Sequence, residues 1–172
     1  MLTSSDMKKT DPGILQLLAA LDEGFNSRAW HGPTLRGSLR GLTSAEALWR
    51  PAPGRHNIWE IVVHAAYWKY VVRRSITGEK RGSFPLKGSN WFPRDRADAA
   101  LWRDDLRLLA DQHRKLHSAI ETIQPARLDL VARKRFTVAA LIRGIAAHDL
   151  YHAGQIQLLK RLRVNEPPRR RR

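Results

Sequence analysis

Two histidines stand one helical turn apart in the segment 148–152, which reads HDLYH. Residues four positions apart project from the same face of a helix. That face is otherwise apolar, because His148 follows Ile145 by three residues and His152 precedes Ile156 by four. The spacing therefore predicts that both imidazole rings point into the core of a helical domain.

A third histidine has the same character on a different predicted helix. His64 follows Ile61 by three residues and precedes Trp68 by four, which places it on the apolar stripe. Three inward imidazoles need partners, since a buried unpaired polar group costs roughly 1–3 kcal/mol. A single metal ion would satisfy all three. Neutral imidazole is a good ligand for Zn, Ni, Fe or Cu, and three protein ligands leave one coordination position for water or substrate.

Another pair of histidines competes for the same interpretation. His113 and His117 are also four residues apart, and His113 lies between Leu109 and Leu116 on an apolar stripe. The simpler reading makes His113 a core histidine bonded to a neighbouring helix and places His117 on the flank. With seven histidines in the chain, such spacing also arises by chance. Periodicity alone leaves open which pair binds a metal, or whether either does.

Polar neighbours of these histidines are candidates for proton transfer or for orienting a ligand. Glu60 precedes His64 by four residues and is a candidate general base, although it also fits as the helix-capping partner of Asn57. Gln155 follows His152 by three residues and is a candidate for orienting a ligand or substrate. Asp149 points about 100° away from His148, so we expect it to support a neighbouring helix or a partner chain.

Other residues are expected around the mouth of the site or in close helix packing. Arginines and aromatic residues in the flanking segments are candidates to bind a carboxylate or an apolar group: Arg50, Arg55, Trp59, Tyr67 and Trp91. Gly144 and Gly154 lie inside a predicted helix, where glycine costs roughly 1 kcal/mol relative to alanine. That cost predicts close packing against both glycines.

The composition describes one domain with an excess of positive charge. The 172 residues include no cysteine, which excludes disulfides, thiolate metal sites and a cysteine nucleophile. The formal net charge of +15 makes nucleic-acid binding a hypothesis to test. We predict a single domain over residues 1–166 and a basic, disordered tail over residues 167–172, which contains four arginines. Without a signal peptide or membrane-spanning run, the chain is expected in the cytoplasm.

Apolar periodicity and capping residues predict four helices, at about residues 12–25, 57–75, 95–124 and 137–163. A short helical turn with a capping box is predicted at Thr43–Glu46. The segment from Gly78 to Arg94 is rich in Gly, Pro and Ser and is long enough to cross the whole bundle. The second and third helices would then be parallel in an all-α four-helix bundle without convincing strands.

Two runs of the sequence resemble the DinB/YfiT-like superfamily. They are residues 49–64, WRPAPGRHNIWEIVVH, preceded by Gly41-Leu42-Thr43, and residues 148–156, HDLYHAGQI. The resemblance implies an up-down-down-up four-helix bundle, often dimeric, that holds one divalent metal ion (Zn, Ni, Fe or Mn). The implied ligands are one histidine of the second helix, His64, and two of the fourth, His148 and His152.

The same resemblance implies a reaction class. Some relatives are metal-dependent hydrolases, or transferases that add bacillithiol, mycothiol or glutathione to small electrophiles. We therefore expect a metal-dependent hydrolase or thiol S-transferase that acts on a small molecule, as a homodimer. Two alternatives are a basic nucleic-acid-associated stress protein and a bundle whose metal is purely structural. No membrane partner is expected.

Overall fold

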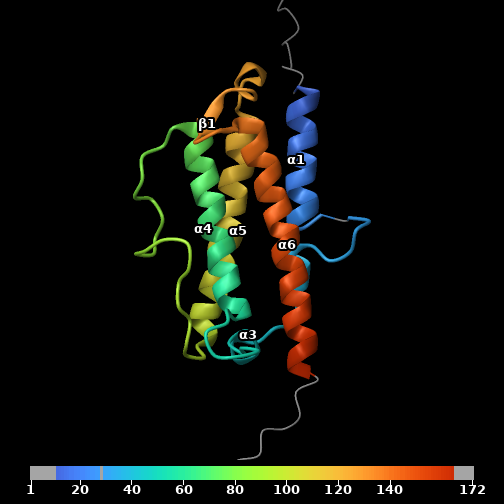
Figure 1. Cartoon of the computed structure of the whole chain (residues 1–172), viewed down its shortest axis with the longest axis vertical. Helices are drawn as coiled ribbons and strands as arrows, with labels where there is room; N and C mark the ends of the chain where they lie inside the picture. Colours follow the sequence, from blue (N-terminus) through green and yellow to red (C-terminus); the bar gives the residue numbers. More distant parts are fainter. Residues whose placement is uncertain (1–10, 28, 165–172) are drawn as a thin grey trace, which may run out of the picture.

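Four long helices make up most of the molecule, a computed structural model that describes residues 11–27 and 29–164. Figure 1 shows them side by side along the long axis. Their bounds are α1 Pro12–Phe25, α4 Ile58–Thr77, α5 Ala99–Glu121 and α6 Val138–Val164. Helix α4 packs against α5 and α6, and α1 packs against α6 and α5. The all-α four-helix bundle expected from the sequence is therefore confirmed.

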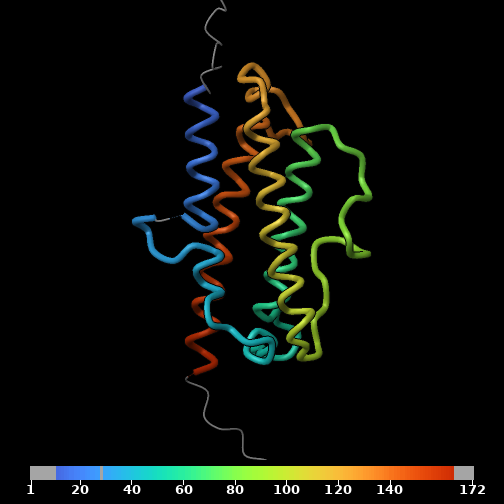
Figure 2. The backbone as a smooth tube through the Cα atoms, turned by 180° about the vertical axis from the view of Figure 1, so that it is seen from behind, coloured from blue at the N-terminus to red at the C-terminus, as the bar shows by residue number. Residues whose placement is uncertain are grey.

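The colours in Figures 1 and 2 show that α1 and α6 run in one direction, whereas α4 and α5 run in the other. The connection between α4 and α5 follows the outside of α4 from one end of the bundle to the other, as Figure 2 shows from behind. This long crossover makes α4 and α5 parallel, as its length predicted.

Side-chain caps explain where the long helices begin. Asp11 accepts hydrogen bonds from the backbone N–H groups of Gly13 and Ile14 at the start of α1. Asn57 and Glu60 form a capping box at the start of α4, and Asp98 caps α5. Gly78 ends α4 with φ of 78°, a left-handed conformation that favours glycine.

Short elements complete the connections. They are α2 Leu35–Ser38, the predicted capping-box turn α3 Ser44–Ala47, a 3₁₀ turn at Pro125–Arg127, and strands β1 Val131–Arg133 and β2 Phe136–Thr137. The strands pair antiparallel as a small hairpin between α5 and α6. The expectation of no strands was wrong here, because a three-residue strand is too short to show a period in the sequence.

The buried apolar residues form two clusters, and polar side chains lie between them along each helix. One cluster includes the apolar residues between Ile58 and Ala66 of α4, and the other includes Val72 and Ile76. Lys69, between these two sets, is fully buried. The same order holds on α5, where buried His113 separates the clusters, and on α6 near Asp149. A polar layer therefore crosses the middle of the core.

Within the described residues, no helix combines the length and apolar character needed to cross a membrane. The predicted basic tail, residues 167–172, lies outside the described residues.

An ion pair between Lys69 and Asp149 joins α4 to α6 in the polar layer. Both side chains have 0% exposure. Lys69 Nζ donates to Asp149 Oδ2 and also lies 4.8 Å from the centre of the Phe25 ring. Asp149 thus supports a neighbouring helix, which confirms the first of its two expected roles.

We predict that Lys69→Met lowers the free energy of unfolding by about 3–5 kcal/mol, because it leaves the Asp149 carboxylate buried without its cation. The double variant Lys69→Met/Asp149→Leu should recover most of that loss, since it removes both charges. Urea denaturation of the metal-free proteins measures both effects. A double variant that is no more stable than the single one would contradict the prediction.

Candidate metal centre

Three imidazole rings converge between α4 and α6. The Nε2 atom of His148 lies 3.2 Å from Nε2 of His64 and 3.1 Å from Nε2 of His152. The candidate ligand atoms of all three residues lie within 4.8 Å of one another. The structure therefore brings together the three histidines expected from the sequence, one from α4 and two from α6.

Hydrogen bonds at the far ring nitrogens determine which way two of these rings present their lone pairs. Nδ1 of His64 lies 2.8 Å from the backbone carbonyl oxygen of Asn90, and Nδ1 of His152 lies 2.7 Å from Oε1 of Gln155. Both partners are acceptors, so each Nδ1 carries the proton and donates it. The Nε2 atoms of His64 and His152 are then bare acceptors that face the third ring.

The third ring, His148, cannot donate a hydrogen bond to both of these Nε2 atoms. As a neutral imidazole it has at most one proton on Nε2 and can donate to only one neighbour. A tetrahedral metal ion with metal–nitrogen bonds of about 2.0–2.1 Å separates its ligand nitrogens by about 3.3 Å. Two of the three separations, 3.1 and 3.2 Å, come close to that value, and the third is within 4.8 Å. The donor set could therefore hold one divalent cation at this position.

The environment keeps the three rings neutral, which is the form that binds a metal. Burial lowers the pKa of His64 to about 4 and that of His148 to about 3, and burial also lowers the pKa of His152. At neutral pH these imidazoles therefore carry no charge and need not lose a proton to coordinate a cation.

The crossover between α4 and α5 builds one wall of the site. Asn90 has φ of 64°, which turns its carbonyl oxygen onto His64, and its Oδ1 accepts a hydrogen bond from Trp68 Nε1 at 2.9 Å. The next residue, Trp91, stacks between His64 and His56, with ring centres 3.9 and 3.6 Å away. These contacts fix the plane of the His64 ring.

A cavity of about 560 Å³ opens onto the three histidines. Its wall includes the rings of Trp91 and Tyr151, the apolar side chains of Ile61 and Leu158, and Arg55. This volume is in the range of small-molecule sites. A ligand in it can reach the position that three histidines leave open on a tetrahedral ion.

The two candidate catalytic residues occupy different places. Gln155 touches His152 directly, so the structure places it where it orients a ligand ring. Glu60 instead forms an ion pair with Arg50, lies 3.0 Å from Nδ1 of His56, and accepts a hydrogen bond from the backbone N–H of Arg94. Burial by itself raises the pKa of Glu60, but the hydrogen bonds from Arg50 and His56 lower it by more, so the net pKa is about 2. Glu60 caps α4 and positions the surrounding loops, and its carboxylate is not part of the histidine group.

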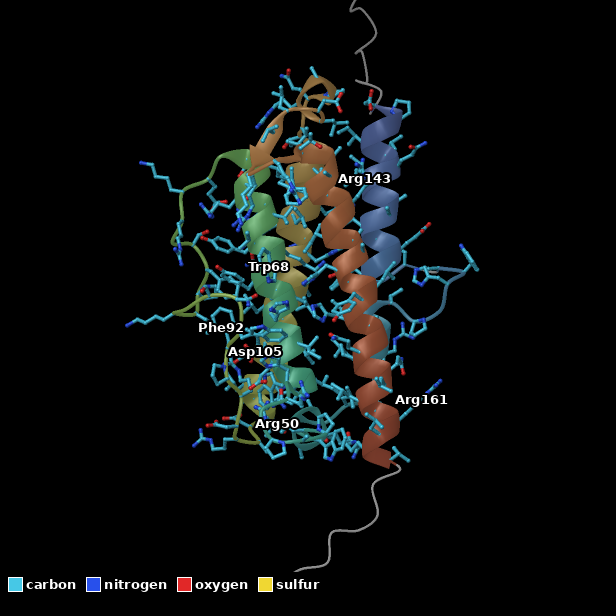
Figure 3. The ribbon with its side chains drawn as sticks, viewed as in Figure 1. Arg50, Trp68, Phe92, Asp105, Arg143 and Arg161 are labelled. Atoms are coloured by element: carbon cyan, nitrogen blue, oxygen red, sulfur yellow. The ribbon has the colours of Figure 1, made fainter. Side chains whose placement is uncertain are left out.

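Of the residues expected at the mouth of the site, two line the cavity and three lie elsewhere. Trp91 and Arg55 line the cavity, as expected. Trp59 is fully buried, with its Nε1 donating to Asp105, so its placement at the mouth was wrong. Arg50 pairs with Glu60 near the end of the bundle (Figure 3), and Tyr67 packs against Phe84 and Phe92. Trp59 lies five residues before His64, so the helical period directs it to another side of α4. Tyr67 lies only three residues after His64, and its ring instead contacts the crossover residues Phe84 and Phe92.

The competing histidine pair has the simpler role. His113 stacks on Phe25 with ring centres 3.8 Å apart, and its Nε2 lies 3.1 Å from Oδ1 of Asp22 on α1. His117 lies on the flank and pairs with Asp22 and Glu121. Within the described residues, the group of His64, His148 and His152 is the one that has metal-binding geometry.

Sequence reasoning missed Lys69, His56 and Asn90. Lys69 follows buried Val62 by seven residues and precedes buried Val72 by three, so its place on the apolar stripe was a readable signal for a buried cation. His56 and Asn90 lie outside any helix. Their contacts depend on the path of the connections, which periodicity does not describe.

Comparisons with known proteins agree with this architecture. A crystal structure described as the conserved protein of locus from Enterococcus faecalis is similar with a TM-score of 0.61 and 16% sequence identity. The similarity covers 93% of this chain and 99% of that chain, and it concerns the fold. No functionally curated protein matches significantly. The family model of the DinB superfamily matches residues 26–156, which include all three histidines, and the chain therefore belongs to the DinB superfamily.

Proposed function

We propose that the protein is a metal-dependent enzyme that activates a thiol or water for attack on a small electrophile, as a thiol S-transferase or hydrolase. The observation that carries the proposal is the convergence of three neutral imidazoles, two with bare Nε2 atoms, at the foot of a 560 Å³ cavity. A divalent ion bound there supplies a Lewis acid that lowers the pKa of a bound thiol or water and polarises the electrophile.

The residues of the chain provide the other requirements of such a reaction. Asn90 and Gln155 hold the His64 and His152 rings in the orientation that presents Nε2. The Trp91 ring shields one face of His64 and offers an apolar surface to a substrate. Because the chain has no cysteine, a thiol nucleophile must enter as a cosubstrate such as bacillithiol, mycothiol or glutathione.

The two alternatives have less support. Nucleic-acid binding rests on the net charge of +15, and several described arginines, among them Arg50, Arg94 and Arg163, are paired with carboxylates. A purely structural metal needs no cavity beside its ligands, whereas a metal that binds a substrate does. The cavity lined by the three histidines therefore favours the second role. We further propose that the protein works in the cytoplasm, where low-molecular-weight thiols are kept reduced.

We predict that protein purified without an affinity tag contains close to one divalent metal ion per chain. His148→Ala and His152→Ala should each reduce the affinity for zinc by about a hundredfold or more, because they remove a ligand. His117→Ala is the matched control, since it changes the second HxxxH pair, and it should retain the metal. Elemental analysis and competition with a chromophoric chelator measure occupancy and affinity.

Conjugation of small thiols to a chromogenic electrophile then tests the reaction, with ester and amide hydrolysis assayed in parallel. Activity should disappear on chelation and return with metal. Metal content that is equal in the His148→Ala, His152→Ala and His117→Ala proteins would overturn the proposal.

A second prediction concerns the acid stability of the metal-free protein. Histidines whose pKa falls on folding bind protons mainly in the unfolded state, so stability is present above pH 6.5 and is lost as the pH falls toward their folded values. We expect the free energy of unfolding to decrease between pH 6.5 and 4.5, above the range in which Glu60 contributes. His148→Asn should reduce the slope by up to about 1.4 kcal/mol per pH unit.

Urea denaturation at several pH values in the presence of chelator measures this slope. His31→Asn, at an exposed position, is the control and should leave the slope unchanged. A slope equally steep in wild-type and His148→Asn protein would show that His148 is not held neutral by burial.

We also propose a homodimer that uses the exposed face of α6. Tyr151, Leu158 and Leu162 are 64%, 57% and 44% exposed and follow one helical stripe. Tyr151 and Leu158 also line the cavity, so a partner on this face would cover its mouth. Analytical ultracentrifugation should show a dimer that Leu162→Glu converts to monomer, with Leu15→Glu on α1 as the exposed control. A wild-type monomer at tens of micromolar would contradict this arrangement.

A further inference from the structure

A second cavity, of about 330 Å³, shares only one lining residue with the larger one, and that residue is His148. It lies between α4, α6 and the β1–β2 hairpin. Figure 3 shows Trp68 on α4 below the hairpin, and the Trp68 ring forms part of the wall. A molecule in this second cavity can therefore contact His148, one of the candidate metal ligands, from a different side than a molecule in the 560 Å³ cavity.

Most of the wall is apolar. Helix α4 contributes Trp68, Val71 and Val72, and α6 contributes Leu141 and Ile145. Apolar surfaces of this kind bind the hydrocarbon or aromatic body of a ligand. The second cavity is thus suited to an uncharged, water-avoiding group.

Its rim is basic. Arg133 and Lys134, from the hairpin, both line the second cavity. The Arg133 guanidinium lies over the Trp68 ring, 5.6 Å from its centre, and Lys134 has φ of 52° at the hairpin turn. Among the described residues, neither side chain has a carboxylate partner within 4.0 Å, unlike Arg50, Arg73 or Arg94. Two cations without counter-ions beside an apolar cavity form a site for a negative charge.

A glycine in α6 keeps the second cavity open. Gly144 lines it, and a Cβ atom built at this position would meet no atom within 4 Å. The expectation that Gly144 permits close packing within the chain was therefore wrong, and the same holds for Gly154. Glycine inside a helix costs roughly 1 kcal/mol relative to alanine. At position 144 this cost leaves free volume next to His148.

We propose that this second cavity binds a small organic anion, with the apolar body between Trp68 and Ile145 and the anionic head at Arg133 and Lys134. The role of this anion rests on the proposed function: the anion would be the substrate, or the part of the cosubstrate that lies against His148. The binding itself requires neither turnover nor a metal, because the groups that recognise the anion belong to α4, α6 and the hairpin.

The test is isothermal titration calorimetry on the full-length protein, both loaded with zinc and treated with chelator. The probes are 4-phenylbutyrate and its neutral counterpart 4-phenylbutyramide, which has the same apolar body. We expect the carboxylate to bind at least tenfold more tightly than the amide in both forms of the protein. Equal affinities would overturn the inference. Binding of the carboxylate that occurs only with zinc would also overturn it, because that result indicates direct coordination.

Three variants locate the binding. Arg133→Gln should lower the affinity for 4-phenylbutyrate about tenfold, toward that of the amide. Gly144→Leu should abolish binding by filling the cavity, whereas Gly154→Leu, the matched helix-interior control, should bind like wild type. Gly144→Ala should raise the melting temperature, which shows that position 144 tolerates a side chain. Unchanged binding in Arg133→Gln or Gly144→Leu would refute the proposal.

The outcomes separate this inference from the proposed enzymatic function. If the metal-free protein discriminates between the two probes but no activity is found, the second cavity stands and the enzymatic proposal fails. If thiol conjugation occurs but the two probes bind with equal affinity, the enzymatic proposal stands and the proposal of an anion site in the second cavity is refuted.

Discussion

The buried ion pair between Lys69 and Asp149 sets the relative position of the two helices that carry the histidines. Asp149 is the neighbour of His148 on α6, and Lys69 lies five residues beyond His64 on α4, so sliding α4 along α6 by one turn would strand both charges in the core. Stranding a buried charge costs several kcal/mol. Apolar packing above and below tolerates small shifts better than the pair does. The pair therefore fixes the register at which three imidazoles meet.

Much of this arrangement was readable from the sequence because it depends on helical periodicity. The 3.6-residue period places His148, His152 and His64 on buried faces, and capping residues such as Asn57 and Asp98 mark where α4 and α5 begin. Spacing alone did not distinguish His148 and His152 from His113 and His117. That distinction depends on which helix faces which, a tertiary property that the resemblance supplied; the structure brings His148 and His152 together with His64.

The features that the sequence did not predict lie in connections or depend on partners far along the chain. The backbone carbonyl of Asn90 reaches His64 because Asn90 adopts a positive φ. Non-glycine residues rarely do so, and no sequence pattern predicts it here. Trp91 was expected near the site, but its position between His64 and His56 depends on the path of the whole crossover. Glu60 shares a face with His64 by spacing, yet the bidentate contact with Arg50 draws its carboxylate away.

The distribution of charge around the site has a consequence for its chemistry. The three imidazoles are neutral, and the nearby carboxylates of Glu60 and Asp149 are already neutralised by Arg50 and Lys69. A divalent ion held by the histidines would therefore keep its full charge of +2 in a partly desolvated setting, where electrostatic interactions are strong. Such a centre favours an anionic fourth ligand, a thiolate or hydroxide, over a neutral one. With Glu60 and Asp149 held in ion pairs, the compensating negative charge at such a centre would have to come from an external ligand.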